Sequence, residues 1–116
     1  MKVYCKICKL HLTNEVKLYT GGSFGEADEQ DFIQPGFYTI SDGEYFTGSE
    51  GKVIINIEDI VNVVHHTNSS KLGGCCGLDG TEGNKTCANG HEIATEYSDC
   101  WMPHAIIFEK EKTILK

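Results

Sequence analysis

Arginine is absent from this chain of 116 residues, which sets 10 lysines against 17 aspartates and glutamates and has a formal net charge of −7. Arginine is the preferred bidentate reader of phosphate and guanine, so its absence argues against nucleic-acid recognition. The negative charge also repels phosphate backbones and anionic membrane surfaces. We therefore expect neither a nucleic-acid partner nor a membrane, and the charge favours a protein partner with a basic surface.

Long apolar segments are missing as well. No run approaches the roughly 20 residues that a helix needs to cross a bilayer. The first residues also lack the apolar core and the small-residue cleavage site of a secretory signal. We therefore expect a cytoplasmic protein. In a reducing cytosol, the six cysteines are more consistent with metal ligands than with disulfides.

Proline is scarce, with two residues, whereas 13 glycines indicate many tight turns. The apolar residues are mostly of the kinds that favour strands. The length is that of one domain. We predict a single domain over residues 1–116, of the α+β class but mostly β, built of antiparallel hairpins. Residues 110–116 form a charged tail that we expect to fray.

Turn signals and apolar alternation predict where the strands lie. We expect two strands around a tight turn within 3–20, a hairpin over 36–46, a strand at 53–55, a hairpin over 86–95 and a strand at 105–108. The segments 20–35 and 68–84 are typical of loops. One short helix is predicted near residues 57–66, where apolar residues fall at helical spacing after a capping asparagine. Its β-branched residues leave a strand as the alternative.

Cysteine spacing is the clearest chemical signal. Cys5 and Cys8 are separated by two residues in a predicted tight turn, so both thiolates can bind one ion, as in a zinc-ribbon knuckle. A tetrahedral zinc needs two further ligands, and the second half of the site is irregular here. We predict Cys87 as the third ligand and either Cys75 or Cys76 as the fourth.

Other residues stay open as ligands, and they are the last cysteine and two nearby histidines: Cys100, His91 and His104. Six sulfurs could also hold a second metal ion if ligands were shared or histidines joined. All six cysteines are therefore candidate ligands, and zinc is the expected cofactor.

Thiol chemistry is the alternative interpretation. A disulfide between the adjacent residues Cys75 and Cys76 would be strained and easily reduced, which suits a redox switch. Cys100 precedes His104 by four residues, and a thiolate with an imidazole is the minimum for a nucleophilic cysteine. Pro103 breaks any helical alignment of that pair. A redox sensor or a cysteine-dependent enzyme thus remains the alternative to a metal-stabilised fold.

Three segments resemble a family of small uncharacterised bacterial proteins, namely GCCGLDG at 74–80, CANGHE at 87–92 and SDCWMPH at 98–104. The N-terminal Cys-x-x-Cys pair and the TGSEG segment at 47–51 belong to the same pattern, so the resemblance covers most of the chain. It implies no activity, but it suggests that these segments act as one unit, as around a shared metal centre. We predict a zinc-stabilised, protein-binding module without catalytic activity.

Overall fold

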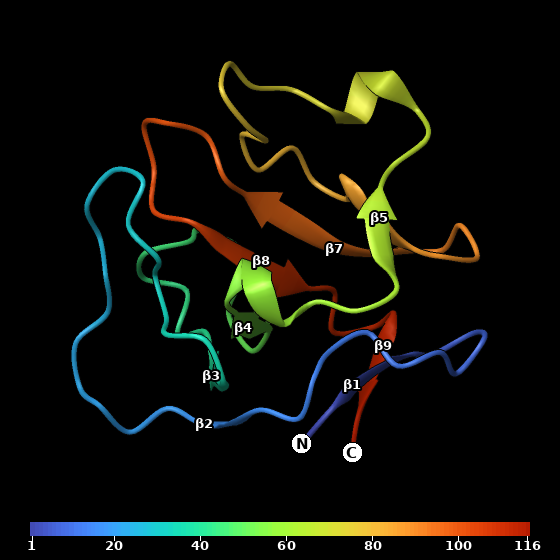
Figure 1. The fold of residues 1–116 in the computed structure, drawn as a ribbon, viewed down its shortest axis with the longest axis horizontal. Coiled ribbons are helices and arrows are strands. Elements are labelled where there is room, and N and C mark those ends of the chain that lie inside the picture. Colours follow the sequence, from blue (N-terminus) through green and yellow to red (C-terminus); the bar gives the residue numbers. More distant parts are fainter.

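The computed structural model describes all 116 residues and consists almost entirely of strands and loops (Figure 1). The strands are β1 (Val3–Cys5), β2 (Lys17–Leu18), β3 (Phe37–Ile40), β4 (Val53–Ile55), β5 (Val63–His65), β6 (Lys85–Cys87), β7 (Glu92–Tyr97), β8 (Ala105–Phe108) and β9 (Thr113–Leu115). Seven of them form one sheet in the order β2-β3-β4-β8-β7-β6-β5, and β1 pairs with β9 in a separate ribbon. All pairs are antiparallel except β2 with β3, so the mostly β fold is confirmed.

The central strands β4 and β8 are apolar on both faces because both faces of the sheet are covered. Ile55 pairs with Ile106, and both belong to the larger core cluster. Their neighbours Ile54 and Ile107 pair on the opposite face and belong to a smaller cluster. Successive residues of a strand point to opposite faces, so continuous apolar runs build two cores at once.

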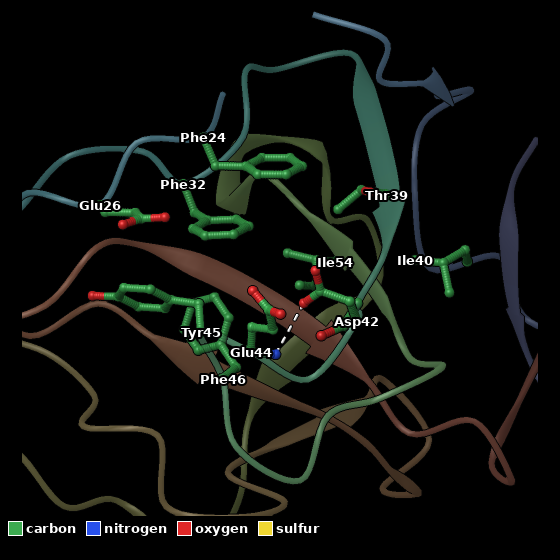
Figure 2. Close-up of a pocket in the computed structure, with 11 residues that line it drawn as sticks. Phe24, Glu26, Phe32, Thr39, Ile40, Asp42, Glu44, Tyr45, Phe46 and Ile54 are labelled. Atoms are coloured by element: carbon green, nitrogen blue, oxygen red, sulfur yellow. Dashed lines mark hydrogen bonds between the residues drawn. The ribbon is translucent and has the colours of Figure 1, made fainter. Parts of the chain in front are cut away.

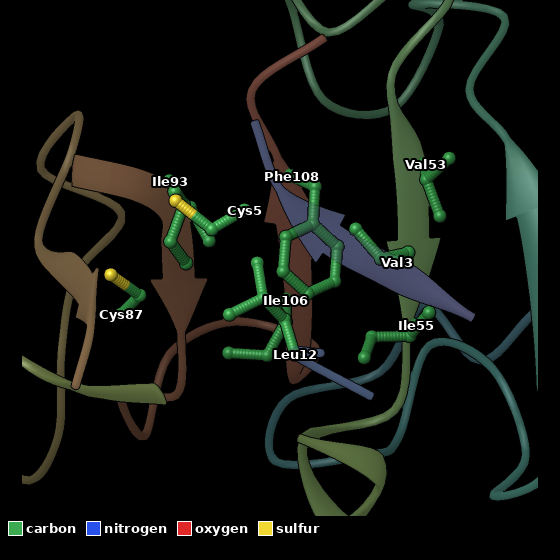
Figure 3. Packing of buried hydrophobic residues seen from close by; sticks show 10 residues of the cluster. Val3, Cys5, Leu12, Val53, Ile55, Cys87, Ile93, Ile106 and Phe108 are labelled. Carbon is green, nitrogen blue, oxygen red and sulfur yellow. The ribbon is translucent and has the colours of Figure 1, made fainter. Parts of the chain in front are cut away.

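The larger core cluster extends to the residues from which the candidate site is built (Figure 3). Val3 and Cys5 enter it from β1, and Cys87 enters it from the end of β6. All three are fully or almost fully buried. Any change at the two cysteines is therefore also a change in the core.

Residues 110–116 do not fray, contrary to the prediction. They include β9, which pairs with β1, and Lys2 and Lys116 exchange backbone hydrogen bonds of 2.7 and 2.9 Å. A charged sequence gives no sign of this pairing, because the two strands meet only when the chain ends come together. Since β1 ends at Cys5, the C-terminal segment helps to hold the first candidate ligand in place.

The predicted strand pairs have different outcomes. Within 3–20 the second strand is wrong, because β1 pairs with β9 and residues 10–16 form only the isolated bridges Tyr4↔His11 and Thr13↔Ile60. The hairpin over 86–95 is confirmed as β6 and β7, as are the strands at 53–55 and 105–108. The hairpin over 36–46 is wrong in its second half, because β3 pairs with β4 and not with residues 45–46. Ser41 closes the true hairpin through hydrogen bonds with Lys52 and Gly51 of 2.8 and 2.9 Å. Phe46 is instead buried among aromatic rings in the loop between β3 and β4.

The short helix expected near 57–66 is reduced to one 3-10 turn, η1 (Ile57–Asp59), which Asn56 caps by accepting a 2.8 Å hydrogen bond from the Glu58 N–H. Ile60 has extended backbone, and β5 follows at Val63. The β-branched residues thus prevail over the helical spacing. A second 3-10 turn, η2 (Ser69–Lys71), lies within the segment expected to be a loop. Neither turn is long and apolar enough to span a membrane.

Candidate metal centre and thiol cluster

Three sulfurs and one imidazole nitrogen converge at the edge of the larger core cluster. They belong to Cys5, Cys8, Cys87 and His91, and their ligand atoms all lie within 4.8 Å of one another. The Sγ atoms of Cys8 and Cys87 are 3.8 Å apart. The His91 Nδ1 atom lies 3.6 Å from Cys5 Sγ and 3.3 Å from Cys87 Sγ. This group could hold a metal ion.

Two tight turns bring these ligands together. After β1, the chain folds back so that Lys9 donates to the Cys5 carbonyl at 2.9 Å and Cys5 donates to the Leu10 carbonyl at 2.8 Å. In the β6–β7 hairpin, Cys87 donates to the His91 carbonyl at 2.9 Å. Gly90 permits that turn, since its φ of 88° lies in the left-handed region. Each turn therefore supplies two ligands from one compact piece of backbone.

The surroundings of the two N-terminal thiols differ. Burial raises the pKa of the Cys5 thiol above its ordinary value. The Asn89 side chain and the Leu10 backbone N–H lower the pKa of Cys8 to about 6. Asn89 belongs to the β6–β7 turn, so one half of the site stabilises the thiolate of the other half.

The structure separates the six cysteines predicted as ligands into two groups. Cys5, Cys8 and Cys87 come together as predicted, but neither Cys75 nor Cys76 takes the fourth position. The fourth ligand atom of the group comes from His91, which was one of the alternatives. His91 directly precedes β7, whereas the second group lies just beyond its other end. Six residues of strand span about 20 Å, so one ion cannot bind both groups.

Three free cysteines lie at the second place, Cys75, Cys76 and Cys100. Cys76 and Cys100 form a group with Asp99 whose ligand atoms all lie within 4.8 Å of one another, and Cys75 lies outside that group. The Sγ atoms of Cys75 and Cys76 are 3.9 Å apart, and those of Cys76 and Cys100 lie within 4.8 Å of each other. Cys75 and Cys76 are exposed, and Cys100 is half-buried. The neighbouring Cys100 and Cys75 thiols raise the pKa of Cys76 to about 12. We call these three residues the thiol cluster.

Asp99 organises the thiol cluster. One of its carboxylate oxygens accepts hydrogen bonds from the backbone N–H groups of Cys76 and Cys100 at 2.9 and 2.8 Å. The other accepts from the Cys75 N–H at 2.9 Å and from the Trp101 indole at 3.0 Å. These donors, with Cys76 and Cys75 foremost, hold the pKa of Asp99 well below its usual range. Because both oxygens are occupied, Asp99 orients the thiols and is poorly placed to bind a metal.

A cleft of about 460 Å³ lies beside β3 and β4, and sequence reasoning did not anticipate it (Figure 2). One part of its wall is aromatic and comprises Phe24, Phe32, Tyr45 and Phe46. Phe24 and Phe32 stack with their ring centroids 4.6 Å apart and their planes within 3°. Phe24 and Phe32 come from the loop between β2 and β3, and Tyr45 and Phe46 come from the loop between β3 and β4, so only the folded chain places the four rings together.

Acidic residues line another part of this cleft. Glu26, Asp42 and Glu44 line it, and no lysine or histidine does. Figure 2 shows the Asp42 and Glu44 carboxylates close together beneath the two stacked rings, and the Glu44 N–H donates to Asp42 at 2.9 Å. The cleft thus combines ring faces with uncompensated negative charge.

Comparison with protein-family models, with curated proteins and with solved structures finds no match to this chain. The family resemblance of segments 74–80, 87–92 and 98–104 therefore stays a prediction. Any functional argument rests on the geometry of the metal centre, the thiol cluster and the cleft.

Proposed function

We propose that this chain is a non-enzymatic protein-binding module, held in its fold by one zinc ion and specific for a basic segment of its partner. The observation that supports binding most directly is the cleft, with four aromatic residues and three carboxylates in its wall. Cations are attracted to the faces of aromatic rings and to carboxylates, so a lysine or arginine side chain is the chemistry that this wall suits.

Zinc is the proposed ion because the distances fit its preferred geometry. Tetrahedral zinc has bonds of about 2.3 Å to sulfur and about 2.0–2.1 Å to nitrogen, which place sulfurs ~3.8 Å from one another and ~3.6 Å from the nitrogen. The Cys8–Cys87 and Cys5–His91 separations of 3.8 and 3.6 Å match these values, and the Cys87–His91 separation of 3.3 Å is shorter by about 0.3 Å. Three cysteines and one histidine complete the tetrahedron, which is the pattern of a structural site. In our proposal the ion joins β1 to the β6–β7 hairpin.

Thiol catalysis, the alternative, has less support. An active nucleophile needs a lowered pKa and a free base, whereas the pKa of Cys76 is raised to about 12. The nearest imidazole, His104, has its Nε2 atom 3.0 Å from the Asp99 carbonyl oxygen. Asp99 itself is occupied by the backbone. A reducing cytosol, our proposed location, would keep these thiols free.

The cleft yields a test with a soluble probe. A fluorescent lysine-rich peptide should bind the zinc-loaded protein. Tyr45→Leu should weaken binding about twofold to thirtyfold, because one cation–π contact contributes about 0.5–2 kcal/mol. Glu44→Gln should weaken binding by up to about fivefold, because one exposed ion pair contributes about 0.2–1 kcal/mol. Tyr45 is 43% exposed, so the fold should tolerate its loss. Anisotropy titrations at several salt concentrations give the dissociation constants, and binding should weaken as salt rises.

The matched control is Glu111→Gln, which removes one exposed carboxylate in the turn between β8 and β9, away from the cleft. It should leave the affinity unchanged if the site is the cleft and not the overall charge. A glutamate-rich peptide and duplex DNA should not bind. Equal affinities across the three variants, or tight binding of the DNA, would contradict the proposal.

A further inference from the structure

The thiol cluster offers sulfur donors and almost nothing else. Both Asp99 oxygens accept N–H hydrogen bonds from the surrounding backbone and indole. His104, the nearest imidazole in sequence, directs its Nε2 atom to the Asp99 carbonyl oxygen at 3.0 Å. An ion at this place would therefore meet three sulfurs from Cys75, Cys76 and Cys100. Sulfur-only sites select soft metals.

We propose that Cys75, Cys76 and Cys100 form a second metal site that binds a soft ion with a closed d shell, foremost Cu⁺. This site is independent of the structural centre, by which we mean the candidate metal centre at Cys5, Cys8, Cys87 and His91. Three bonds of about 2.3 Å in a plane place their sulfurs about 4 Å apart. The Cys75 and Cys76 sulfurs, 3.9 Å apart, meet this requirement, and the Cys76 and Cys100 sulfurs lie within 4.8 Å of each other. The Cys75 and Cys100 sulfurs are farther apart and must approach each other when the ion binds. Zinc prefers four ligands and would lack one here, whereas Cu⁺ is stable with three sulfurs. Each thiol that binds releases its proton to solvent.

The backbone of this site is arranged before any ion arrives. Asp99 fixes the N–H groups of all three cysteines, which draws segment 75–76 onto the residues after β7. The approach is so close that a Cβ atom at Gly77 would lie 2.2 Å from the Ser98 carbonyl oxygen. A Cβ atom at Gly74 would lie 1.9 Å from the Gly77 carbonyl oxygen. Pre-organised ligands lose little entropy on binding.

Exposure distinguishes this site from the structural centre. Cys75 and Cys76 are exposed, whereas Cys5 and Cys87 are buried. An ion at the thiol cluster is therefore reachable by a partner or a competing ligand. We infer that it exchanges with solution while the structural zinc stays in place. The contrast with zinc rests on the zinc centre proposed above, and the inference does not depend on the cleft or on its ligand.

The test uses zinc-loaded protein and Cu⁺ delivered from a coloured Cu⁺ chelator in the presence of a reductant. We expect one Cu⁺ per chain with no zinc released, and X-ray absorption should show three sulfur neighbours. Trp101 is the only tryptophan and its indole binds Asp99, so its fluorescence should change with the first equivalent. Cys76→Ser should lower the affinity by more than the about 10–100-fold that losing an outer-shell partner costs.

Asp99→Asn should lower the affinity for Cu⁺ about 10–100-fold as a change in the outer shell, with the three sulfurs still bound. Ser70→Ala, an exposed change in η2, is the matched control and should alter nothing. Zinc content and circular dichroism show that each variant is folded, which is expected because Cys76 is exposed. Zinc displaced atom for atom by Cu⁺, or equal Cu⁺ affinity in Cys76→Ser, would overturn the proposal, as would the absence of Cu⁺ uptake.

Discussion

Cys5→Ser is expected to abolish zinc binding and to leave the chain largely unfolded at temperatures where the wild type is folded. Cys5 is fully buried and belongs both to the ligand group and to the larger core cluster. Zinc contributes about 10–16 kcal/mol to the folding of small zinc peptides. A small domain has only about 5–15 kcal/mol of net stability, so losing the ion removes most of it. Thermal midpoints, and zinc content by elemental analysis, measure the effect.

Cys100→Ser is the control, because Cys100 lies in the thiol cluster and not at the structural centre. It should keep its zinc and lose at most about 1–3 kcal/mol, the usual range for an imperfectly paired hydroxyl. His91→Ala tests the fourth ligand and should behave like Cys5→Ser, only less severely, because three sulfurs remain. If Cys100→Ser lost the metal while Cys5→Ser kept both metal and stability, the ligand set proposed here would be wrong.

Local sequence signals predicted half of the candidate metal centre. The spacing of Cys5 and Cys8 fits one tight turn, and an Asn-Gly turn predicted the hairpin that positions Cys87. The same hairpin contained the signal for His91, because residues 87 and 91 flank its turn and face each other. The sequence analysis nevertheless predicted a fourth sulfur, from Cys75 or Cys76, and kept His91 as an alternative. The distance between His91 and Cys76 depends on the direction of β7, which local spacing does not reveal.

The errors in the fold have a similar cause. Asp42-Gly43 is a good hairpin signal, yet β3 pairs with β4, and Phe46 packs against Phe32 and Tyr97 instead of joining a strand. Residues 110–116 look like a solvated tail until β1 supplies a partner. In each case a contact between distant parts of the chain decided between conformations that the local sequence permits.

Sequence reasoning also did not predict one buried ion pair. Breaking this pair is expected to lower the free energy of unfolding substantially. Lys85 on β6 and Glu96 on β7 are 4% and 7% exposed, and their Nζ and Oε1 atoms are 3.1 Å apart. Ser98 donates a 2.7 Å hydrogen bond to the other Glu96 oxygen, and the His65 Nδ1 atom lies 3.0 Å from Lys85 Nζ. The ion pair thus joins β6, which ends at Cys87, to β7, which begins directly after His91.

Lys85→Met should lower the free energy of unfolding by about 3–5 kcal/mol, because it leaves the Glu96 carboxylate buried without its partner. The double change Lys85→Met with Glu96→Leu removes both charges and should recover most of that loss, since a buried ion pair and an apolar pair of similar volume differ little in stability. Urea unfolding at saturating zinc keeps the metal from contributing to the difference. Equal losses in the single and double variants would contradict this prediction, because they would show that the loss does not come from an unpaired Glu96 carboxylate.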